Sequence, residues 1–543
     1  MARRHSLALL LCALSAGWWR CSESASAKVS YGELSGNALA SVDEFVGVPF
    51  AKPPVGNRRF AAPVDWSEHY GPSVYNATEF GARCPQPKWD ESTVAQDESC
   101  LFLNIWSPRN AGGGSALLPV LVFIYGGSFI AGAGDMYNGT EFAQRAGVVV
   151  VNLNYRLGAL GFAVLGGLSG NFGLLDQQSA LRWLSRELHA FGGDASKVLL
   201  FGESAGSISA SAHLLLPGSA GLFQAALMES GVVSTTPEQL SRDCGAQLAA
   251  LVNCSGPKTV ECARAAHWKD VLAAQTELLT PPRNGTEFDV KCSFWTSVDG
   301  ATIPEDAEAL MRRGAFYPVP VVVGVNHDEG GAFAYQDYKD PMDLQTLMTN
   351  IRTLLNARGQ QEHPGNLDSI LKAYLIEDDG ADLRPIWGQL VGDFLFACKS
   401  RRFLRMHQGH PRAPKAFKYV FAQRAAQDPS PTAWGVYHSS ELPFVWGVNE
   451  SGSMSMIPSL TPSEGKLRDA MQSLWGRFAA GGDLNIGESS SGSVSWPKYD
   501  AHSDLHLELK VQSFLSKSGF RQVQCDAWDK VWNGHLDFTP TLV

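Results

Sequence analysis

The chain has 543 residues, of which 45% are hydrophobic and 18% are charged, and its formal net charge is -10 at pH 7. This composition is typical of a globular protein with a sizeable core, and it excludes a disordered chain. The acidic charge balance offers no basic surface to a polyanion, which excludes nucleic acid as a partner. The length allows one large elaborated domain or several smaller ones.

The N-terminus has the pattern of a secretory signal peptide. Two arginines precede the apolar run Ser6–Gly17, which is too short to span a bilayer. Ala25–Ala27 fits a cleavage site, and Ser15–Gly17 is a competing site. We therefore expect residues 1–27 to be the signal peptide and residues 28–543 to form one large domain. No later run reaches membrane length and no anchor or retention signal ends the chain, which predicts secretion without a transmembrane anchor.

Cysteines and glycosylation sequons agree with export. An even number of cysteines in an oxidising compartment predicts disulfides, and sequons predict a glycoprotein. The cysteines beyond the signal region are Cys84, Cys100, Cys244, Cys254, Cys262, Cys292, Cys398 and Cys525. The sequon asparagines are Asn76, Asn138, Asn253, Asn284 and Asn449.

Short apolar runs typical of buried strands alternate with helical patterns along the chain. The predicted strands are 45–48, 101–106, 119–125, 148–152, 197–201, 319–324 and 417–421. Apolar residues on one helical face predict helices over 174–191 and 467–478. The alternation predicts an α/β fold with a large, mostly parallel central sheet flanked by helices. The helix-rich stretches 235–315 and 335–415 predict insertions over the edge of the sheet that holds the active site.

The strand at 197–201 leads into Gly202-Glu-Ser-Ala-Gly206 and then into small residues that open a helix. Glycines at both ends allow the strand and the helix to pack closely while Ser204 projects outward. The N-terminus of the helix then faces any developing negative charge. This pentapeptide alone is a weak signal, because an ordinary turn between a strand and a helix has the same composition.

A serine nucleophile needs a base and an acid that orients the base. Among 13 histidines, His438 stands out by its setting before Glu441-Leu-Pro443. Glu329 follows a predicted strand, and the carboxyl ends of parallel strands are where α/β enzymes build their sites. On the residues alone, neighbouring Asp328 is an equal candidate for the acid. The order serine, acid, histidine is that of α/β-hydrolases.

Seven ordered motifs resemble those of the type-B carboxylesterase/lipase family, which includes carboxylesterases, cholinesterases and fungal lipases. The motifs are Cys100–Asn104, Tyr125–Gly127, Asn154–Leu157, Gly173–Gln177, Phe191–Asp194, Gly202–Gly206 and Gly324–Gly330. The resemblance extends from about residue 28 to residue 532. It implies an α/β-hydrolase fold and hydrolysis of small-molecule or lipid esters through an acyl-enzyme, with no metal and no cofactor.

The resemblance also implies roles for individual residues. The nucleophile, acid and base fall on Ser204, Glu329 and His438, and the oxyanion-hole amides fall on Gly127, Ser128 and Ala205. Most relatives have glycine where this chain has Ser128. Because losing one oxyanion donor slows turnover strongly without abolishing it, we expect reduced or reshaped activity.

Structural pairs follow from the same resemblance. The implied disulfides are Cys84–Cys100, Cys254–Cys262 and Cys398–Cys525, and the implied buried ion pair joins Arg59 to Glu98. Cys244 and Cys292 are left over, either paired with each other or free.

The substrate pocket is predicted with less detail. Cholinesterases have an aromatic residue where this chain has Ala332, and Trp89 is one position out of register with their choline-binding tryptophan, which favours a packing role. Acyl-pocket positions fall on Val290 and Cys292, which are smaller than the phenylalanines of an acetyl-selective site, and Phe333 completes the predicted pocket. A general carboxylesterase is therefore favoured over a cholinesterase, and a lipase acting on long-chain glycerides is the nearer alternative.

An alternative of another class is a catalytically silent, cholinesterase-like domain used for binding or adhesion. Relatives of that kind have typically lost a member of the triad. Ser204, Glu329 and His438 are all present here, which favours the enzyme. The oligomeric state is not readable from the sequence.

Overall fold

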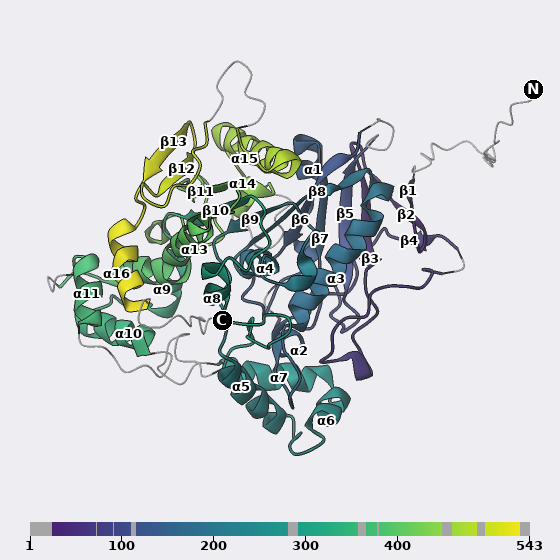
Figure 1. The fold of residues 1–543 in the computed structure, drawn as a ribbon, viewed down its shortest axis with the longest axis horizontal. Coiled ribbons are helices and arrows are strands. Elements are labelled where there is room, and N and C mark those ends of the chain that lie inside the picture. The colour runs from purple at the N-terminus through teal and green to yellow at the C-terminus, as the bar shows by residue number, and fades with distance from the viewer. Residues whose placement is uncertain are drawn as a thin grey trace, which may run out of the picture.

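A computed structural model provides the structure of the chain. It describes residues 24–71, 73–88, 90, 92–109, 116–280, 292–356, 365–376, 380–447, 459–485 and 495–532. A 13-stranded sheet runs through the molecule in the order β1-β2-β3-β5-β7-β6-β8-β9-β10-β11-β12-β13, with β4 paired to β2. Helices flank the sheet (Figure 1), which is the expected α/β architecture.

The strands are β1 (Ser24–Val29), β2 (Gly32–Ala38), β3 (Val42–Pro49), β4 (Tyr75–Asn76), β5 (Phe102–Pro108), β6 (Leu118–Ile124), β7 (Val149–Leu153), β8 (Gly193–Glu203), β9 (Ala225–Glu229), β10 (Val321–Asn326), β11 (Ala416–Phe421), β12 (Leu505–Lys510) and β13 (Ser513–Ser518). The helices are α1 (Thr140–Ala146), α2 (Gly158–Phe162), α3 (Phe172–Glu187), α4 (Ala205–His213), α5 (Glu238–Leu251), α6 (Thr259–Ala265), α7 (Trp268–Leu279), α8 (Ala307–Arg312), α9 (Gly331–Asp337), α10 (Leu344–Asn356), α11 (Asn366–Ala373), α12 (Arg384–Gly392), α13 (Cys398–Gly409), α14 (Leu442–Val445), α15 (Pro462–Gly481) and α16 (Gln522–Trp532).

The centre of the sheet is parallel and its edges are antiparallel. The run from β7 through β6, β8, β9, β10 and β11 to β12 pairs in parallel. The outer pairs, such as β1 with β2 and β12 with β13, are antiparallel. Every residue of β7 and of β10 is buried, as expected for parallel strands covered by helices on both faces.

The strands predicted from apolar runs all belong to this sheet, but the edge strands were not predicted. Polar residues dominate β13 and alternate with apolar residues in β2, so neither strand forms a continuous apolar run. The central strand β9 was missed for a different reason. Its sequence is Ala-Ala-Leu-Met-Glu, and these residues are better helix formers than strand formers, so its position between β8 and β10 is imposed by tertiary packing.

The first strand includes residues of the expected cleavage site. β1 begins at Ser24, and the side chains of Ala25 and Ala27 are buried against the core. Cleavage after Ala27 would remove residues 24–27 from a strand that pairs with β2 along its whole length.

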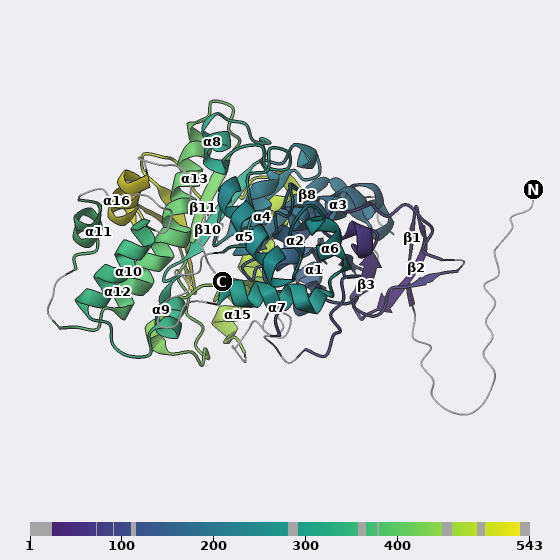
Figure 2. The ribbon, with the colours of Figure 1, turned by 90° about the horizontal axis from the view of Figure 1, so that it is seen from below.

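The two predicted insertions are helical, and they meet where α8 packs against α13. Figure 1 shows α5, α6 and α7 grouped at the lower end of the sheet, with α10 and α11 beside α16 on the left. Figure 2 shows α10, α12 and α13 at the opposite end of the molecule from β1, β2 and β3. A π-helix, Asp393–Ala397, joins α12 directly to α13.

Three disulfides are present, and they join the pairs that the resemblance implied. They are Cys84–Cys100, Cys254–Cys262 and Cys398–Cys525. The thiols of Cys244 and Cys292 are buried, hydrogen-bonded to each other and not joined as a disulfide. The Arg59 guanidinium binds the Glu98 carboxylate through two contacts of 2.6 and 2.5 Å in the interior. Within the described part of the chain, no helix is long and apolar enough to cross a membrane.

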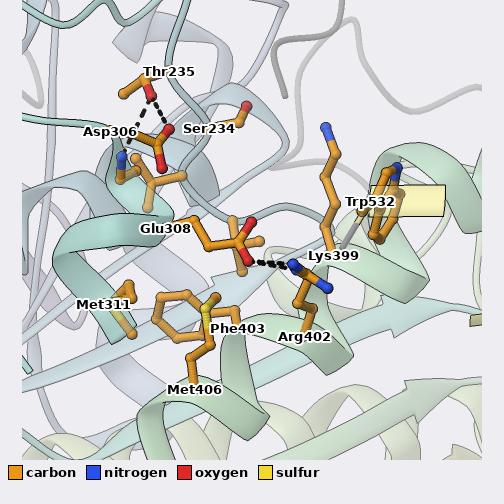
Figure 3. Close-up of a pocket in the computed structure, with 13 residues that line it drawn as sticks. Ser234, Thr235, Asp306, Glu308, Met311, Lys399, Arg402, Phe403, Met406 and Trp532 are labelled. Carbon is orange, nitrogen blue, oxygen red and sulfur yellow. Dashed lines mark hydrogen bonds and ion pairs between the residues drawn. The ribbon is translucent and has the colours of Figure 1, made fainter. Parts of the chain in front are cut away.

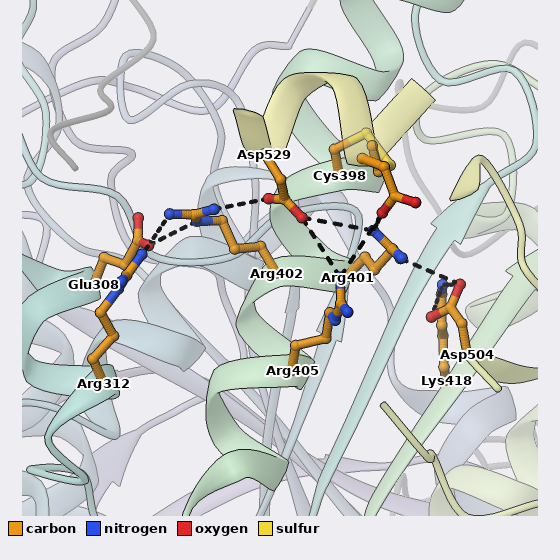
Figure 4. Close-up of polar contacts among 11 residues, drawn as sticks. Glu308, Arg312, Cys398, Arg401, Arg402, Arg405, Lys418, Asp504 and Asp529 are labelled. Atoms are coloured by element: carbon orange, nitrogen blue, oxygen red, sulfur yellow. Dashed lines mark hydrogen bonds and ion pairs between the residues drawn. A yellow bond between two sulfur atoms is a disulfide. The ribbon is translucent and has the colours of Figure 1, made fainter. Parts of the chain in front are cut away.

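Ion pairs and a disulfide fix the C-terminal helix α16 to α13 (Figure 4). Arg401 Nη1 lies 2.8 Å from Asp526 Oδ1, and Arg402 Nη1 lies 2.8 Å from Asp529 Oδ1. Cys398–Cys525 closes a loop of 127 positions, for which loop-closure entropy gives about 4 to 5 kcal/mol of stabilisation. Helix α13 is therefore held firmly between α16 and the sheet.

Candidate active site

Ser204 occupies a sharp turn between β8 and α4. Its backbone dihedrals are φ 56° and ψ -121°, a conformation that costs a residue other than glycine about 1 to 3 kcal/mol. A Cβ atom at Gly206 would lie 1.8 Å from the carbonyl oxygen of Ile124, and one at Gly202 would lie 2.4 Å from the backbone of Gly206. Both glycines are therefore required for the close approach of strand and helix that presents Ser204.

Glu329 and His438 come together from loops that follow neighbouring strands. Glu329 lies three residues after the end of β10, and His438 lies in the loop between β11 and α14. His438 Nδ1 is 2.8 Å from Glu329 Oε2, and the other oxygen of Glu329 accepts a hydrogen bond of 2.7 Å from the amide of Asn326. The carboxylate is thus held from both sides.

Asp328, the alternative acid, points elsewhere. Its Oδ1 lies 2.8 Å from His327 Nδ1, and its Oδ2 accepts a hydrogen bond of 3.0 Å from the amide of Val436. The structure therefore separates two adjacent carboxylates that the sequence pattern left equivalent, and it places Glu329 against His438.

The imidazole of His438 also contacts a second carboxylate. Its Nε2 lies 3.2 Å from Glu203 Oε1, and the same Glu203 oxygen accepts a hydrogen bond of 2.6 Å from Ser439 Oγ. Among the described residues, no hydrogen bond joins Ser204 to His438, although both side chains line one cavity. Sequence reasoning did not assign Glu203 to the site. The sequence feature that could have identified Glu203 is a charged residue directly before the serine, at the buried, otherwise apolar end of a strand.

The surrounding acids change the protonation of the site. Burial disfavours the imidazolium of His438, but the carboxylates of Glu203, Glu329 and Glu441 outweigh burial and raise its pKa to about 9. Burial and the neighbouring carboxylates raise the pKa of Glu441 to about 8. Burial likewise raises the pKa of Glu203 and of Glu229. Buried acids with raised pKa values thus surround a histidine whose cationic form is favoured.

Two phenylalanines cover the His438 ring. The ring of Phe396 stacks on it with a centroid distance of 4.3 Å and an interplanar angle of 19°. Phe333 lies 5.6 Å away at 40°. Phe396 belongs to the π-helix between α12 and α13, an irregularity that is frequent at functional sites. These contacts restrict the orientation of the imidazole.

The site opens into a cavity of about 700 Å³, including the space that is open to solvent. Its lining residues are Gly127, Ser128, Glu203, Ser204, Ile208, Val232, Ser234, Trp295, Phe333, Leu395, Phe396, Lys399, His438 and Ser439. Of the predicted pocket residues, Phe333 lines the cavity, while Cys292 and Ala332 are buried and are not among its lining residues. Trp89 and Val290 lie outside the described residues.

Three successive residues in the loop after β6 also adopt a left-handed backbone conformation. Gly127, Ser128 and Phe129 have φ values of 98°, 56° and 59°. Ser128 adopts a left-handed conformation that glycine would adopt without strain. The Phe129 ring anchors the loop, because it packs edge-on against Trp295 at 4.8 Å. Gly127 and Ser128 line the cavity, whereas Ala205 is buried at the first position of α4.

The described residues do not form a metal centre. No group of three or more histidine, cysteine, aspartate or glutamate side chains within them is arranged to hold a metal ion. The described residues that line the cavity include Ser204, His438 and Glu203, and serine, histidine and carboxylate are the groups of acyl-transfer chemistry.

A strained serine turn at the carboxyl end of a parallel strand, with glutamate and histidine from later loops, defines the class of α/β-hydrolases. The family model described as "Carboxylesterase family" matches residues 23–528. The chain belongs to the carboxylesterase family, and it is therefore a member of the carboxylic ester hydrolases. It is 32% identical to the acylcarnitine hydrolase of Mus musculus, over 90% of this chain and 88% of that protein. It is 29% identical to the acetylcholinesterase of Danio rerio, over 94% of this chain and 89% of that protein.

Proposed function

We propose that this protein is a secreted serine hydrolase of carboxylic esters that forms an acyl-enzyme on Ser204. The observation that carries the proposal is the 2.8 Å contact between His438 and Glu329 beside a serine that lines the same cavity. A serine hydroxyl becomes nucleophilic at neutral pH when an oriented imidazole accepts its proton.

Each member of the triad has one role in the proposed reaction. His438 Nε2 accepts the proton of Ser204 as Oγ attacks the ester carbonyl carbon, and it then gives this proton to the departing alcohol. Glu329 holds the imidazole through Nδ1 and stabilises its cationic form. Water repeats the attack on the acyl-enzyme and releases the acid. Because Nε2 lies 3.2 Å from Glu203, the Ser204 hydroxyl competes with that carboxylate for Nε2, and catalytic hydrogen bonds of this kind tighten when substrate binds.

The oxyanion of the tetrahedral intermediate is assigned to the backbone amides of Gly127, Ser128 and Ala205. Gly127 and Ser128 line the cavity together with Ser204. Ala205 opens α4, where the helix dipole and the first amide groups favour negative charge. The left-handed conformation of Ser128 supports the assignment of its backbone amide as a donor, because the loop accommodates the side chain without changing this conformation.

The substrate is proposed to be a carboxylic ester with a sizeable apolar part. Trp295, Phe333, Leu395 and Phe396 provide an apolar lining for the cavity. Ala332 stands where cholinesterases have an aromatic residue, so a general carboxylesterase is favoured over a cholinesterase. A lipase that acts on long-chain glycerides is the second candidate, and a catalytically silent binding domain is the candidate of another class.

Secretion is part of the proposal. The three disulfides fit an oxidising compartment. Two of the sequon asparagines, Asn76 and Asn253, are exposed, while Asn284 and Asn449 lie outside the described residues. Because Ser24–Ala27 belongs to β1, we place signal cleavage before this strand, which favours the site at Ser15–Gly17 over Ala25–Ala27.

A fluorophosphonate probe tests the proposed function directly. We expect the wild-type protein to be labelled at Ser204 and to hydrolyse 4-nitrophenyl esters. Ser204→Ala should lose both properties and keep the circular dichroism spectrum of the wild type. Ser185→Ala is the matched control, because Ser185 is exposed on α3 and donates only to the carbonyl of Arg182. A folded wild-type protein that takes up no probe would favour the silent binding domain.

A further inference from the structure

A second cavity adjoins the active-site cavity and shares part of its wall. It has a volume of about 490 Å³, including the space that is open to solvent. Val232, Ser234 and Lys399 line both cavities. Figure 3 shows the Lys399 side chain extending from α13 along one side of this second cavity, with Ser234 on the loop that follows β9. The two spaces therefore meet at a lysine.

Lys399 brings a positive charge into an apolar part of the active-site cavity. Among the described residues that line this cavity, it is the only lysine or arginine. The residue is only 8% exposed, and its Nζ lies 5.5 Å from the centroid of the Phe394 ring. Coulomb attraction is several times stronger in such a partly desolvated setting than in water. A negative group on a ligand in this cavity is therefore attracted strongly toward Lys399.

The carboxylates of the second cavity are engaged with other groups. Glu308 forms ion pairs with Arg402 at 2.5 Å and with Arg312 at 2.6 Å. Asp306 caps α8 through the amide of Ala309 at 3.0 Å and accepts a hydrogen bond of 2.9 Å from Thr235. These contacts hold the side chains of both acids in place.

The carboxylate among the described lining residues is Glu203, and it is already engaged. Its Oε1 lies 3.2 Å from His438 Nε2 and accepts a hydrogen bond from Ser439. A substrate anion finds no favourable partner in Glu203, whereas Lys399 offers one. The arrangement that follows places the ester at Ser204 and the anion at Lys399.

We propose that Lys399 makes this cavity selective for esters that carry a carboxylate remote from the scissile bond, such as hemi-esters of dicarboxylic acids. This inference rests on the proposed ester hydrolysis and specifies its substrate class. The Lys399 side chain lines the cavity, and a substrate carboxylate that reaches its ammonium gains a charge-assisted hydrogen bond.

The test compares charged and uncharged esters of matching length. The charged set comprises the 4-nitrophenyl hemi-esters of glutaric, adipic and pimelic acid, and the uncharged set comprises 4-nitrophenyl esters of monocarboxylic acids of the same chain length. A second pair, the hexanoyl esters of 4-hydroxybenzoate and of phenol, places the carboxylate on the alcohol side. The readout is the ratio of kcat/KM for charged and uncharged esters in the wild type, in Lys399→Met and in Lys399→Arg, after subtraction of spontaneous hydrolysis.

We expect the ratio to favour the charged ester in one of the two sets. It should fall about tenfold or more in Lys399→Met, because a hydrogen bond to a charged group is lost, and Lys399→Arg should retain most of it. The set in which the ratio falls identifies the acyl or the alcohol side. A ratio that favours uncharged esters in the wild type, or that is the same in Lys399→Met, overturns the inference while ester hydrolysis itself stands.

A binding measurement separates this inference from the proposed function. Calorimetry on Ser204→Ala, with and without Lys399→Met, measures the affinity for the hemi-adipate ester and for its uncharged counterpart. If no ester is hydrolysed, the proposed function fails, and tighter binding of the charged ester that depends on Lys399 still supports the inference. Equal affinity for the two esters in both variants contradicts it.

Discussion

The cavity has two walls that differ in origin and in what constrains them. The sheet wall carries Ser204 and His438 on loops that follow β8 and β11, and Glu329, on the loop that follows β10, contacts His438. The insertion wall carries Trp295, Leu395, Phe396 and Lys399, which precede α8 or lie along the helices from α12 to α13. On the sheet wall the backbone admits little change, whereas on the insertion wall side-chain identity sets the size and charge of the space.

Under the proposed function, we expect the chemistry to depend on the sheet wall and the substrate selectivity to depend on the insertion wall. Positions on the sheet wall are held by close backbone contacts, such as that of Gly206 with Ile124. The insertion wall meets the same cavity through side chains, and it can change without disturbing the serine turn. We therefore expect substitutions on the sheet wall to change rate or folding, and substitutions on the insertion wall to change substrate preference.

The largest effect should come from the acid that orients His438. Glu329→Gln is expected to lower kcat/KM for 4-nitrophenyl butyrate by about 10⁴-fold, because an amide in place of the carboxylate no longer holds the imidazole in the required tautomer. Asp328→Asn is the matched control and should lower it by no more than about threefold, since its side chain contacts His327 and Val436 instead. Equal losses in the two variants would mean that the assignment of the acid is wrong.

The backbone constraint of the sheet wall is tested by adding one methyl group. Gly206→Ala places a Cβ 1.8 Å from the carbonyl oxygen of Ile124, and overpacking of this severity should destabilise the fold by about 3 kcal/mol or more. Gly409→Ala is the control, because a Cβ there meets no atom within 4 Å. Thermal unfolding of the two purified variants gives the comparison, and similar melting temperatures would contradict the close contact.

The acids around His438 predict a pH dependence. The pKa of His438 is raised to about 9, and a base must be neutral to accept a proton, so kcat/KM should rise with pH through the neutral range up to that pKa. Glu203→Gln removes a charge that stabilises the imidazolium. The pKa of His438 should then fall, and the rise of kcat/KM should move to lower pH by about one unit or more. Ser185→Ala leaves both carboxylates and their hydrogen bonds in place and serves as the control, and a profile that does not move in Glu203→Gln would mean that Glu203 does not affect the base.

The smallest effect is expected at the strained loop after β6. Ser128 has a φ of 56°, so Ser128→Gly should relieve strain and stabilise the protein by up to about 1 kcal/mol, with part of the gain offset by the greater chain entropy of glycine. We expect kcat/KM to rise a few fold as the oxyanion amides settle. Chemical denaturation and steady-state kinetics measure both quantities. Lower stability in Ser128→Gly would show that the serine side chain contributes contacts that outweigh its strain.

The sequence by itself determined much of the sheet and the chemistry. Continuous apolar runs predicted β3, β5, β6, β7, β8, β10 and β11, because strands covered on both faces need apolar residues throughout. The glycines around Ser204 predicted the serine turn, because such a turn restricts residue type locally. The motif order predicted the family, which the family model over residues 23–528 confirms.

Only the tertiary structure decided which side chains meet across the chain. Glu203 and His438 are far apart in sequence and 3.2 Å apart in space, and no local pattern encodes that contact. The same holds for Phe396 on His438 and for Lys399 at the junction of the two cavities. Local periodicity reports which face of an element is buried, but the partner on that face depends on how distant helices pack. For this reason the serine turn was readable from the sequence, and the side chains of the insertion wall that line the cavity were not.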